Sequence, residues 1–363
     1  MKGLMKYLSP MAPDISGAVA VLFDKGGMIV ILDAGGCTGN VCGFDEPRWM
    51  EDIPAGAGRS AIFSAGLRDM DAIFGRDEHL MKKIGAVIED VKPHFLALIG
   101  SPVPSVIGTD FRALRKMAEA RFGIPVLTVP VTGMDLYDRG EKMAYKAYLE
   151  RFPWESDILG AIPLNLLPGD TPDLLLKRAR AMAAPPAPLM DTRGPREGQS
   201  AEMASDREQA DRTAAADDSW NLAVSPAALF AAEKVMTQDK IPYRAFYPLP
   251  AWLTAKLDST AGETEPILIV HQSLLAESIR TYLVKRGSEA VIRTGTWFSP
   301  LDRTDVRFAW EEDFEAYVRD GHFGTILADP LLARAAHGQY RRWIDLPHFA
   351  VSGSSLAMGG KHR

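Results

Sequence analysis

Short apolar runs that alternate with helix-like segments constrain the fold of this chain more than any other feature. Residues 27–33, 94–100 and 124–129 each have the composition of a buried strand, and residues 349–352 are also strand-like. Segments with helical periodicity, such as 15–23 and 110–121, lie among them, and we expect Asp110 and Gly123 to cap the second of these helices. This alternation is typical of parallel sheets flanked by helices. We therefore expect an α/β protein built from doubly wound, Rossmann-like units with parallel sheets.

The length of the chain predicts more than one such unit. At 363 residues the chain exceeds the size at which a single hydrophobic core stays efficient. We expect three similar units, at residues 1–151, 152–264 and 265–363. Within the second, residues 184–218 are rich in Pro, Ala, Gly, Ser and charged side chains, which indicates either a mobile insertion or a degenerate strand and helix.

Charge and hydropathy exclude several classes of partner. The chain has 47 acidic and 41 basic residues, for a net charge of -6, and no basic block with interleaved aromatic residues. A nucleic-acid partner is therefore not expected. No uninterrupted apolar run reaches membrane-spanning length, and the apolar stretch before Ser9 and Pro10 is too short for a signal peptide. We expect a cytoplasmic protein without a membrane partner.

Two cysteines, the only ones in the chain, occupy the glycine-rich stretch 35–43 directly after the strand-like run 27–33. We expect this stretch to be a loop in which Cys37 and Cys42 face one guest. Gly36 and Gly43 beside them allow a bulky ligand to lie against the main chain. Thiolates are the soft ligands that iron-sulfur clusters and zinc prefer, so all four residues are candidate cofactor-binding residues, with the two cysteines as candidate metal ligands.

The residues alone leave several readings of the two cysteines open. Two thiols cannot fill four coordination sites, so either a second copy of the chain supplies two more across a twofold axis or Asp33 or Asp45 supplies an oxygen. Alternatively, both cysteines are small buried hydrophobic residues in a tight turn. A disulfide between them is disfavoured by a reducing cytosol and by the lack of other cysteines.

Two further features have a functional and a structural reading. The segment 56–61 matches Gly-x-Gly-x-x-Ala, but the residues before it do not form a strand, so we do not expect a dinucleotide site. Arg59 within it is available to an anion or a docking partner. His271 ends the strand-like run 267–271, where it is either a proton shuttle or a packing histidine.

The order of several segments resembles nitrogenase component 1 proteins over nearly the whole chain. The segments that carry this resemblance are 32–37, 62–67, 74–75, 106–110, 122–126, 158–164 and 221–226. It implies a three-domain, repeated Rossmann-like fold and a homodimer or related heterodimer. It also implies an iron-sulfur cluster at the subunit interface and electrons from an ATP-hydrolysing iron-sulfur reductase. Cys37 falls where the family has its ligating loop cysteine, in a context like His-Gly-Pro-x-Gly-Cys.

The chain also departs from that family. Residues 9–11 and 101–105 lack the cysteines that many members have there, and Cys42 has no clear counterpart. We therefore expect Cys42 to compensate, so that one 4Fe-4S cluster is bridged by Cys37 and Cys42 of both copies in a homodimer. No cysteine or convincing histidine ligand for a nitrogenase-type catalytic cofactor is present in the last third, so dinitrogen reduction is not expected.

The resulting functional hypothesis is electron relay. A reductase of the nitrogenase iron-protein kind would pass electrons through the cluster to an unidentified substrate, either a tetrapyrrole-like or another small unsaturated molecule. The alternative belongs to another class: a non-catalytic protein that holds or delivers a metallocluster, or a metal-free protein that only binds a partner. Whether the chain is an enzyme is left open by the sequence.

Overall fold

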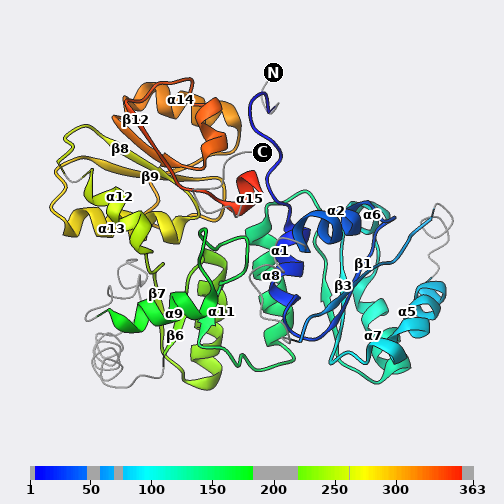
Figure 1. Cartoon of the computed structure of the whole chain (residues 1–363). Helices are drawn as coiled ribbons and strands as arrows, with labels where there is room; N and C mark the ends of the chain where they lie inside the picture. Colours follow the sequence, from blue (N-terminus) through cyan, green and yellow to red (C-terminus); the bar gives the residue numbers. More distant parts are fainter. Residues whose placement is uncertain (1–4, 47–57, 69–76, 183–219, 261, 354–363) are drawn as a thin grey trace, which may run out of the picture. The chain divides into compact units, whose positions relative to one another are not determined.

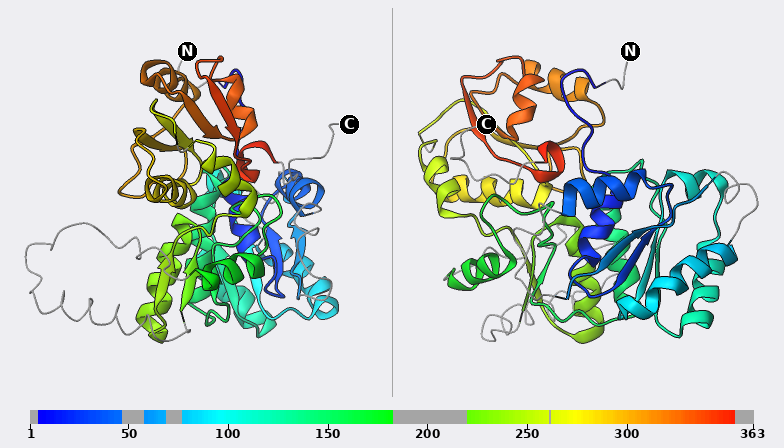
Figure 2. Two further views of the ribbon diagram at one scale, coloured as in Figure 1. Left: turned by 60° about the vertical axis from the view of Figure 1, so that its left-hand side comes forward. Right: turned by 45° about the vertical axis from the view of Figure 1, so that its right-hand side comes forward.

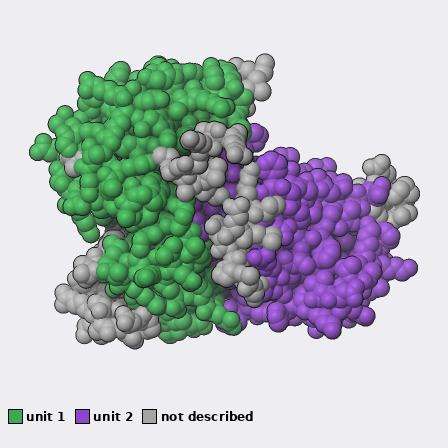
Figure 3. Space-filling model, viewed as in Figure 1, with its two compact units in different colours: residues 1–9, 154–161, 167–347 green, residues 10–153, 162–166, 348–363 purple. Residues whose placement is uncertain are grey.

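A computed structural model describes residues 5–46, 58–68, 77–182, 220–260 and 262–353 of the protein. The chain divides into two compact units, coloured separately in Figure 3. Unit 1 comprises residues 1–9, 154–161 and 167–347, and unit 2 comprises residues 10–153, 162–166 and 348–363. Our division into three units at residues 151 and 264 remains a prediction.

Unit 2 is built on a four-stranded parallel sheet, shown in Figure 1. Its strands, in spatial order, are β2 (Ala61–Ser64), β1 (Met28–Ile31), β3 (Leu96–Ile99) and β4 (Val126–Val129). Every residue of β1 and β3 is buried, as a continuous apolar run in a sheet covered on both faces requires. The order reverses between β1 and β3, so the sheet is doubly wound.

Helices cover both faces of this sheet, as Figure 2 shows. One face packs on α5 (Asp77–Val91) and α7 (Phe111–Phe122) through a shared apolar core. The other face is covered by α1 (Asp14–Leu22) and α8 (Tyr137–Leu149). Two shorter helices, α6 (Pro102–Ile107) and α15 (Phe349–Ser352), complete the described helices of unit 2 apart from the segment after β1.

The crossing of α1 and α8 depends on glycine. A Cβ atom on Gly17 would lie 1.9 Å from the Tyr137 carbonyl oxygen, and one on Gly140 would lie 1.7 Å from the Asp14 carbonyl oxygen. Only residues without a side chain allow the two backbones to approach this closely. The N-terminal end of α1 is therefore held tightly against α8.

Unit 1 contains two further parallel sheets. One has the order β5 (Ile158–Leu159), β6 (Asn221–Ala223), β7 (Tyr243–Ala245). The other has the order β10 (Val306–Arg307), β9 (Ile292–Thr296), β8 (Ile267–Val270), β11 (Thr325–Ala328), β12 (Arg342–Asp345), which reverses between β8 and β11. The described residues of this unit form the helices α9 (Pro172–Ala181), α11 (Pro226–Asp239), α12 (Ala251–Asp258), α13 (Ser273–Lys285), α14 (Glu311–Gly321) and the 3-10 helix η2 (Pro330–Arg334).

The expected fold class is confirmed: parallel sheets and flanking helices recur three times along the chain. The expected ends of α7 are confirmed as well, since the Asp110 carboxylate accepts hydrogen bonds from the amides of Arg112 and Ala113, and Gly123 follows the helix with a φ of 66°. The expectation of a strand at 349–352 was wrong, because this segment forms α15. The segment 184–218 lies outside the described residues.

Candidate functional site

The carboxyl edge of the sheet in unit 2 carries the segment with both cysteines. This segment follows β1, at the point where the strand order reverses between β1 and β3. In doubly wound sheets such a switch point opens a crevice outside the carboxyl ends of the strands, and ligands bind there. The topology therefore places Cys37 where this class of fold commonly holds a ligand.

The cysteine segment is helical, which corrects our expectation of a loop. It forms α2 (Gly36–Asn40) and then a five-residue π-helix, η1 (Val41–Asp45). Gly35 begins the segment with a φ of 114°, a conformation that favours glycine. The four glycines of this stretch have the composition of a loop, but its backbone hydrogen bonds close helical turns. A π-helix is rare and is often found at functional sites.

Asp33 fixes the start of α2. Its buried carboxylate accepts hydrogen bonds from the Thr38 amide at 2.8 Å, the Thr38 hydroxyl at 2.9 Å and the Ser64 hydroxyl at 2.6 Å. These bonds join the start of α2 to the end of β2. Both carboxylate oxygens are used in this way, so Asp33 acts as a structural anchor for Cys37 rather than as the oxygen ligand that we considered.

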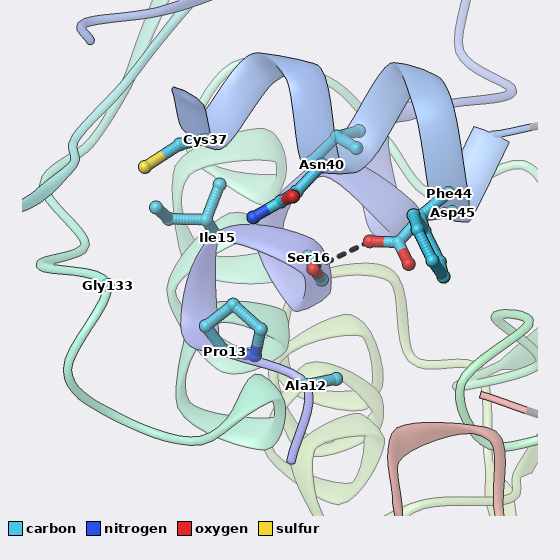
Figure 4. Close-up of a pocket in the computed structure, with 10 residues that line it drawn as sticks. Ala12, Pro13, Ile15, Ser16, Cys37, Asn40, Phe44, Asp45 and Gly133 are labelled. Atoms are coloured by element: carbon cyan, nitrogen blue, oxygen red, sulfur yellow. Dashed lines mark hydrogen bonds between the residues drawn. The ribbon is translucent and has the colours of Figure 1, made fainter. Parts of the chain in front are cut away.

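A pocket of about 400 Å³ lies beside α2 and η1. Its apolar lining comes from the start of α1 and from the cysteine segment: Ala12, Pro13, Ile15, Val41 and Phe44. Its polar lining consists of Ser16, Cys37, Asn40 and Asp45, and Gly133 closes one side. Figure 4 shows the Cys37 sulfur at one end of α2, with Ser16, Phe44 and Asp45 at the other end of the pocket.

Only one of the two cysteines lines this pocket. Cys37 contributes to its wall, whereas Cys42 is not among the lining residues; both are half-buried, free thiols. Gly36 and Gly43 are exposed on the same segment, and neither lines the pocket. The structure thus brings one of the four predicted site residues to the pocket, and the assignment of all four as ligand-binding residues remains a prediction.

The surroundings of both thiols disfavour the thiolate. Burial raises the pKa of Cys37 above its ordinary value of 9.0, and the charges of Asp33 and Asp14 raise it further. Burial likewise raises the pKa of Cys42, followed by the charge of Glu46 and a hydrogen bond with it. In the metal-free protein both cysteines are therefore thiols at neutral pH, and metal binding would release their protons.

Asp14 lies between the pocket residues Pro13 and Ile15 and is a buried residue that the sequence alone did not single out. Its carboxylate accepts hydrogen bonds from the amides of Thr132 at 2.9 Å and Gly133 at 2.8 Å. Burial raises the pKa of Asp14 despite these bonds. An acidic residue in the first turn of a helix was visible in the sequence, but its contact with residues 132–133 was not. Asp14 thus positions Gly133 against the first turn of α1.

Ser16 and Asp45 connect the pocket's two helical walls. The Ser16 hydroxyl donates a hydrogen bond of 2.7 Å to the Asp45 carboxylate, as Figure 4 shows. Ser16 lies on α1 and Asp45 on η1, so this bond ties the π-helix to α1. Asp45 was a possible oxygen ligand on the sequence alone, whereas its hydrogen bond with Ser16, 29 positions away, was not predicted.

No group of three or more His, Cys, Asp or Glu side chains among the described residues is arranged to hold a metal ion. Cys37 lines the pocket and is a soft donor, but it belongs to no such group within the described part of the chain. The described residues alone therefore do not supply a complete ligand set for a metal cluster.

The other candidates have structural surroundings. His271 is buried, its Nε2 lies 3.3 Å from the Pro347 carbonyl oxygen, and burial lowers its pKa to about 3. It is therefore neutral near physiological pH and does not fit the role of a proton shuttle there. Of the Gly-x-Gly-x-x-Ala match, residues 56 and 57 lie outside the described residues, and Ala61 begins β2.

Comparison with known proteins adds a family match over residues 15–249, which is well over half of the chain. The matching family is described as nitrogenase component 1 type oxidoreductase. Among solved structures, one titled "Nitrogenase Cp1 at pH 6.5" is similar with a TM-score of 0.62 and 10% sequence identity, covering 99% of this chain and 89% of that one. At this identity the structural likeness establishes the fold alone.

Two curated relatives are similar over shorter stretches. Both are named nitrogenase iron-molybdenum cofactor biosynthesis protein NifE. The protein from Bradyrhizobium diazoefficiens is 30% identical over 89 residues, and that from Clostridium pasteurianum is 32% identical over 85 residues. These matches cover 24% and 23% of this chain but only 16% and 18% of the relatives. Within the described residues, no helix combines the length and apolar character of a membrane span.

Proposed function

Because the chain belongs to the nitrogenase component 1 type oxidoreductases, we propose that it is an iron-sulfur subunit that relays electrons from an ATP-dependent reductase to a small-molecule substrate. The observation that carries this proposal is the position of Cys37. Its thiol lines a pocket at the carboxyl edge of a doubly wound sheet, on a helix anchored by Asp33. A protein-bound iron-sulfur cluster supplies one-electron transfer, and Cys37 would be its ligand.

The ligand count favours a homodimer. One described chain offers two thiols and no metal-binding group of three or more side chains. A twofold axis places the same segment of two copies face to face and doubles the number of thiols. In this arrangement Cys37 of each copy ligates a shared 4Fe-4S cluster, and Cys42 of each copy completes the set if its side chain reaches the interface.

The chain's own residues account for positioning and proton release. Asp33 holds the start of α2, and the Ser16–Asp45 hydrogen bond holds the end of η1. Together they keep the cysteine segment at a defined position before the metal arrives, which reduces the ordering required on binding. Because both thiols have raised pKa values, loading is accompanied by loss of their protons and is favoured at higher pH.

A second function is favoured by the two curated relatives. Both are named as cofactor biosynthesis proteins, and the similarity is near 30% identity, although it spans less than a fifth of either relative. A protein that holds or delivers a metallocluster would use the same Cys37 pocket but would transfer the cluster itself rather than electrons. Tetrapyrrole-like or other small unsaturated substrates belong only to the first proposal.

The first experiment is anaerobic purification with iron and sulfide analysis, electron paramagnetic resonance after dithionite reduction, and measurement of the oligomeric state. We expect a dimer with one cluster. Cys37→Ala should abolish cluster binding, and Cys42→Ala should do so only if no outside ligand replaces it. Gly39→Ala is a matched control, because a Cβ there has nothing within 4 Å and both thiols remain. A metal-free dimer, or full iron in both cysteine variants, contradicts the assignment.

A second experiment separates relay from delivery. The loaded protein is mixed with an ATP-dependent iron-sulfur reductase, and its spectrum is followed with and without ATP. Reduction that requires ATP, with iron retained, supports relay. Loss of iron from this protein to a metal-free acceptor, without reductase-dependent redox change, supports the scaffold function and excludes relay as the main activity.

A further inference from the structure

The Cys37 end of the pocket, formed by Cys37, Ile15 and Gly133, has a chemistry that the cluster proposal does not use. Figure 4 shows the Cys37 sulfur and Gly133 on one side of the pocket, with Phe44 and Asp45 on the other. The pocket volume of about 400 Å³ falls within the range of small-molecule sites, and the lining is mainly apolar, as such sites require. The groups at the Cys37 end therefore decide which guest fits beside the thiol.

One wall of this end uses its main-chain amides within the protein. The amides of Thr132 and Gly133 donate hydrogen bonds to the buried Asp14 carboxylate at 2.9 and 2.8 Å. Gly133 has a φ of 75°, and a Cβ atom on it would lie 2.8 Å from Pro102 Cδ and 3.3 Å from Ile15 Cδ1. This wall is thus closely packed, and these two amides are not available to a guest.

The helical wall uses its amides in the same way. The Thr38 amide donates to the Asp33 carboxylate, and the Val41 amide donates to the carbonyl oxygens of Cys37 and Thr38. The side chains of Val41 and Ile15, which are 1% and 2% exposed, give the pocket an apolar floor. The thiol beside them is only a weak hydrogen-bonding group and packs well against carbon. This end of the pocket therefore favours a guest with an apolar surface.

The charges around the thiol disfavour an ionic guest. The negative charges of Asp14 and Asp33 act on Cys37, so an anion would be repelled there. A cation would lose its hydration without reaching either carboxylate, because both are buried and accept hydrogen bonds from the chain. At the other end, the Asp45 carboxylate accepts a hydrogen bond from Ser16. An uncharged guest avoids these costs.

We propose that the Cys37 end of this pocket binds an uncharged, apolar small molecule, which packs against Ile15 and Val41 and contacts the Cys37 thiol. The lining residues all belong to one chain, so the proposal goes beyond the cluster function and does not depend on iron. It names the class of molecule that occupies the space beside the predicted metal ligand.

The test uses metal-free full-length protein with a single thiol. Cys42→Ala leaves only Cys37, whereas Cys37→Ala leaves only Cys42, which does not line the pocket. The rate of alkylation by N-ethylmaleimide is followed by mass spectrometry with increasing toluene, and direct binding of toluene is measured by saturation-transfer NMR. We expect millimolar toluene to slow the alkylation of Cys37 in a saturable way and to leave that of Cys42 unchanged. Equal slowing of both thiols, or slowing of neither, overturns the proposal.

Charged analogues of toluene test the ligand class. Benzylammonium and benzoate share its ring but have a positive and a negative charge. Both should protect the Cys37 thiol at least about tenfold more weakly than toluene does, because a buried charge without a partner is costly. Protection by either ion at the same concentration as toluene contradicts the assignment of an uncharged guest.

A matched pair of variants locates the guest. Val41→Thr keeps the shape of a lining side chain but adds a hydroxyl group, and should weaken toluene binding about threefold or more. Val106→Thr makes the same change on α6 at a residue that is 82% exposed and does not line the pocket, and should leave binding unchanged. Equal toluene binding by the two variants overturns the proposed position. The thiol and ligand comparisons need neither variant and no iron, so their failure is distinct from failure of the cluster proposal.

Discussion

Removal of the Asp33 carboxylate tests whether α2 is held in place by a single buried side chain. Asp33 is 2% exposed and accepts three hydrogen bonds, two from Thr38 and one from Ser64. Asp33→Ala removes all three and leaves the Thr38 amide without this acceptor at the start of a short helix. We therefore expect both lower stability of unit 2 and a less ordered Cys37.

The magnitude follows from the number and type of these bonds. A hydrogen bond to a charged group contributes about 1.5–3 kcal/mol, but bonds to one carboxylate are not additive, so we expect a loss of about 3–5 kcal/mol in the free energy of unfolding. For a domain of this size, 1 kcal/mol corresponds to a change of about 2–4 °C in Tm, which gives a decrease of about 6–20 °C.

Differential scanning calorimetry and hydrogen exchange at the Thr38 amide measure these effects. Asp24→Ala is the matched control, because the Asp24 side chain is 50% exposed and, within the described residues, forms an ion pair with its sequence neighbour Lys25. Surface pairs of this type contribute little, so its Tm should stay near that of the wild type. If Asp33→Ala has the same Tm as Asp24→Ala, and its Thr38 amide is equally protected from hydrogen exchange, the anchoring role of Asp33 is wrong.

Three further predictions concern packing and pH. Gly140→Ala should destabilise unit 2 severely, because its Cβ would lie 1.7 Å from a backbone oxygen, whereas Gly39→Ala, with open space around it, should have a Tm equal to or above that of the wild type. In metal-free Cys42→Ala protein, alkylation of Cys37 should reach half its maximal rate above pH 9.0, and at a higher pH than in the urea-unfolded chain. Because folding raises the pKa of Cys37, the protonated thiol contributes to the free energy of unfolding below pH 9, and this contribution is lost as the pH rises above 9. A half-maximal pH equal in both states contradicts this. Burial lowers the pKa of His271 to about 3, so unfolding takes up a proton between pH 6.5 and about pH 3. As the pH is lowered through this range, the free energy of unfolding should fall by about 1.4 kcal/mol per pH unit. In denaturant titrations, His271→Gln should reduce this dependence of the free energy of unfolding on pH. An unchanged dependence contradicts a lowered pKa of His271.

Local signals predicted much of the fold correctly. The apolar runs around β1, β3 and β4 were recognised because strands covered on both faces are almost continuously apolar, with Thr128 of β4 as the one polar residue in these three strands. The ends of α7 were recognised from Asp110 and Gly123, which act within one turn of the helix. In contrast, the helix at 36–40 was hidden, because four glycines within nine residues have the composition of a loop.

The candidate site was predicted only in part. Cys37 was selected from its chemistry and its place after β1, and it does line a pocket. Cys42, chosen for the same reasons, lies on the π-helix η1 and does not line the pocket, and no local pattern in the sequence predicted a π-helix there. Asp33 and Asp45 were selected as possible ligands. Asp33 instead accepts a hydrogen bond from Ser64, 31 positions away, and Asp45 accepts one from Ser16, 29 positions away. Both bonds depend on how the elements pack.

The sequence by itself determined the alternation of strands and helices, the helix ends and the place of Cys37 after the first strand, since these depend on hydrophobic periodicity and on contacts within a few residues. Only the tertiary structure decided the pocket. Its walls join residues 12–16, the cysteine segment and Gly133, and Asp14 reaches Thr132 across 118 positions of the chain. Such contacts arise when the sheet and helices pack together, and no local pattern specifies which distant segments will meet.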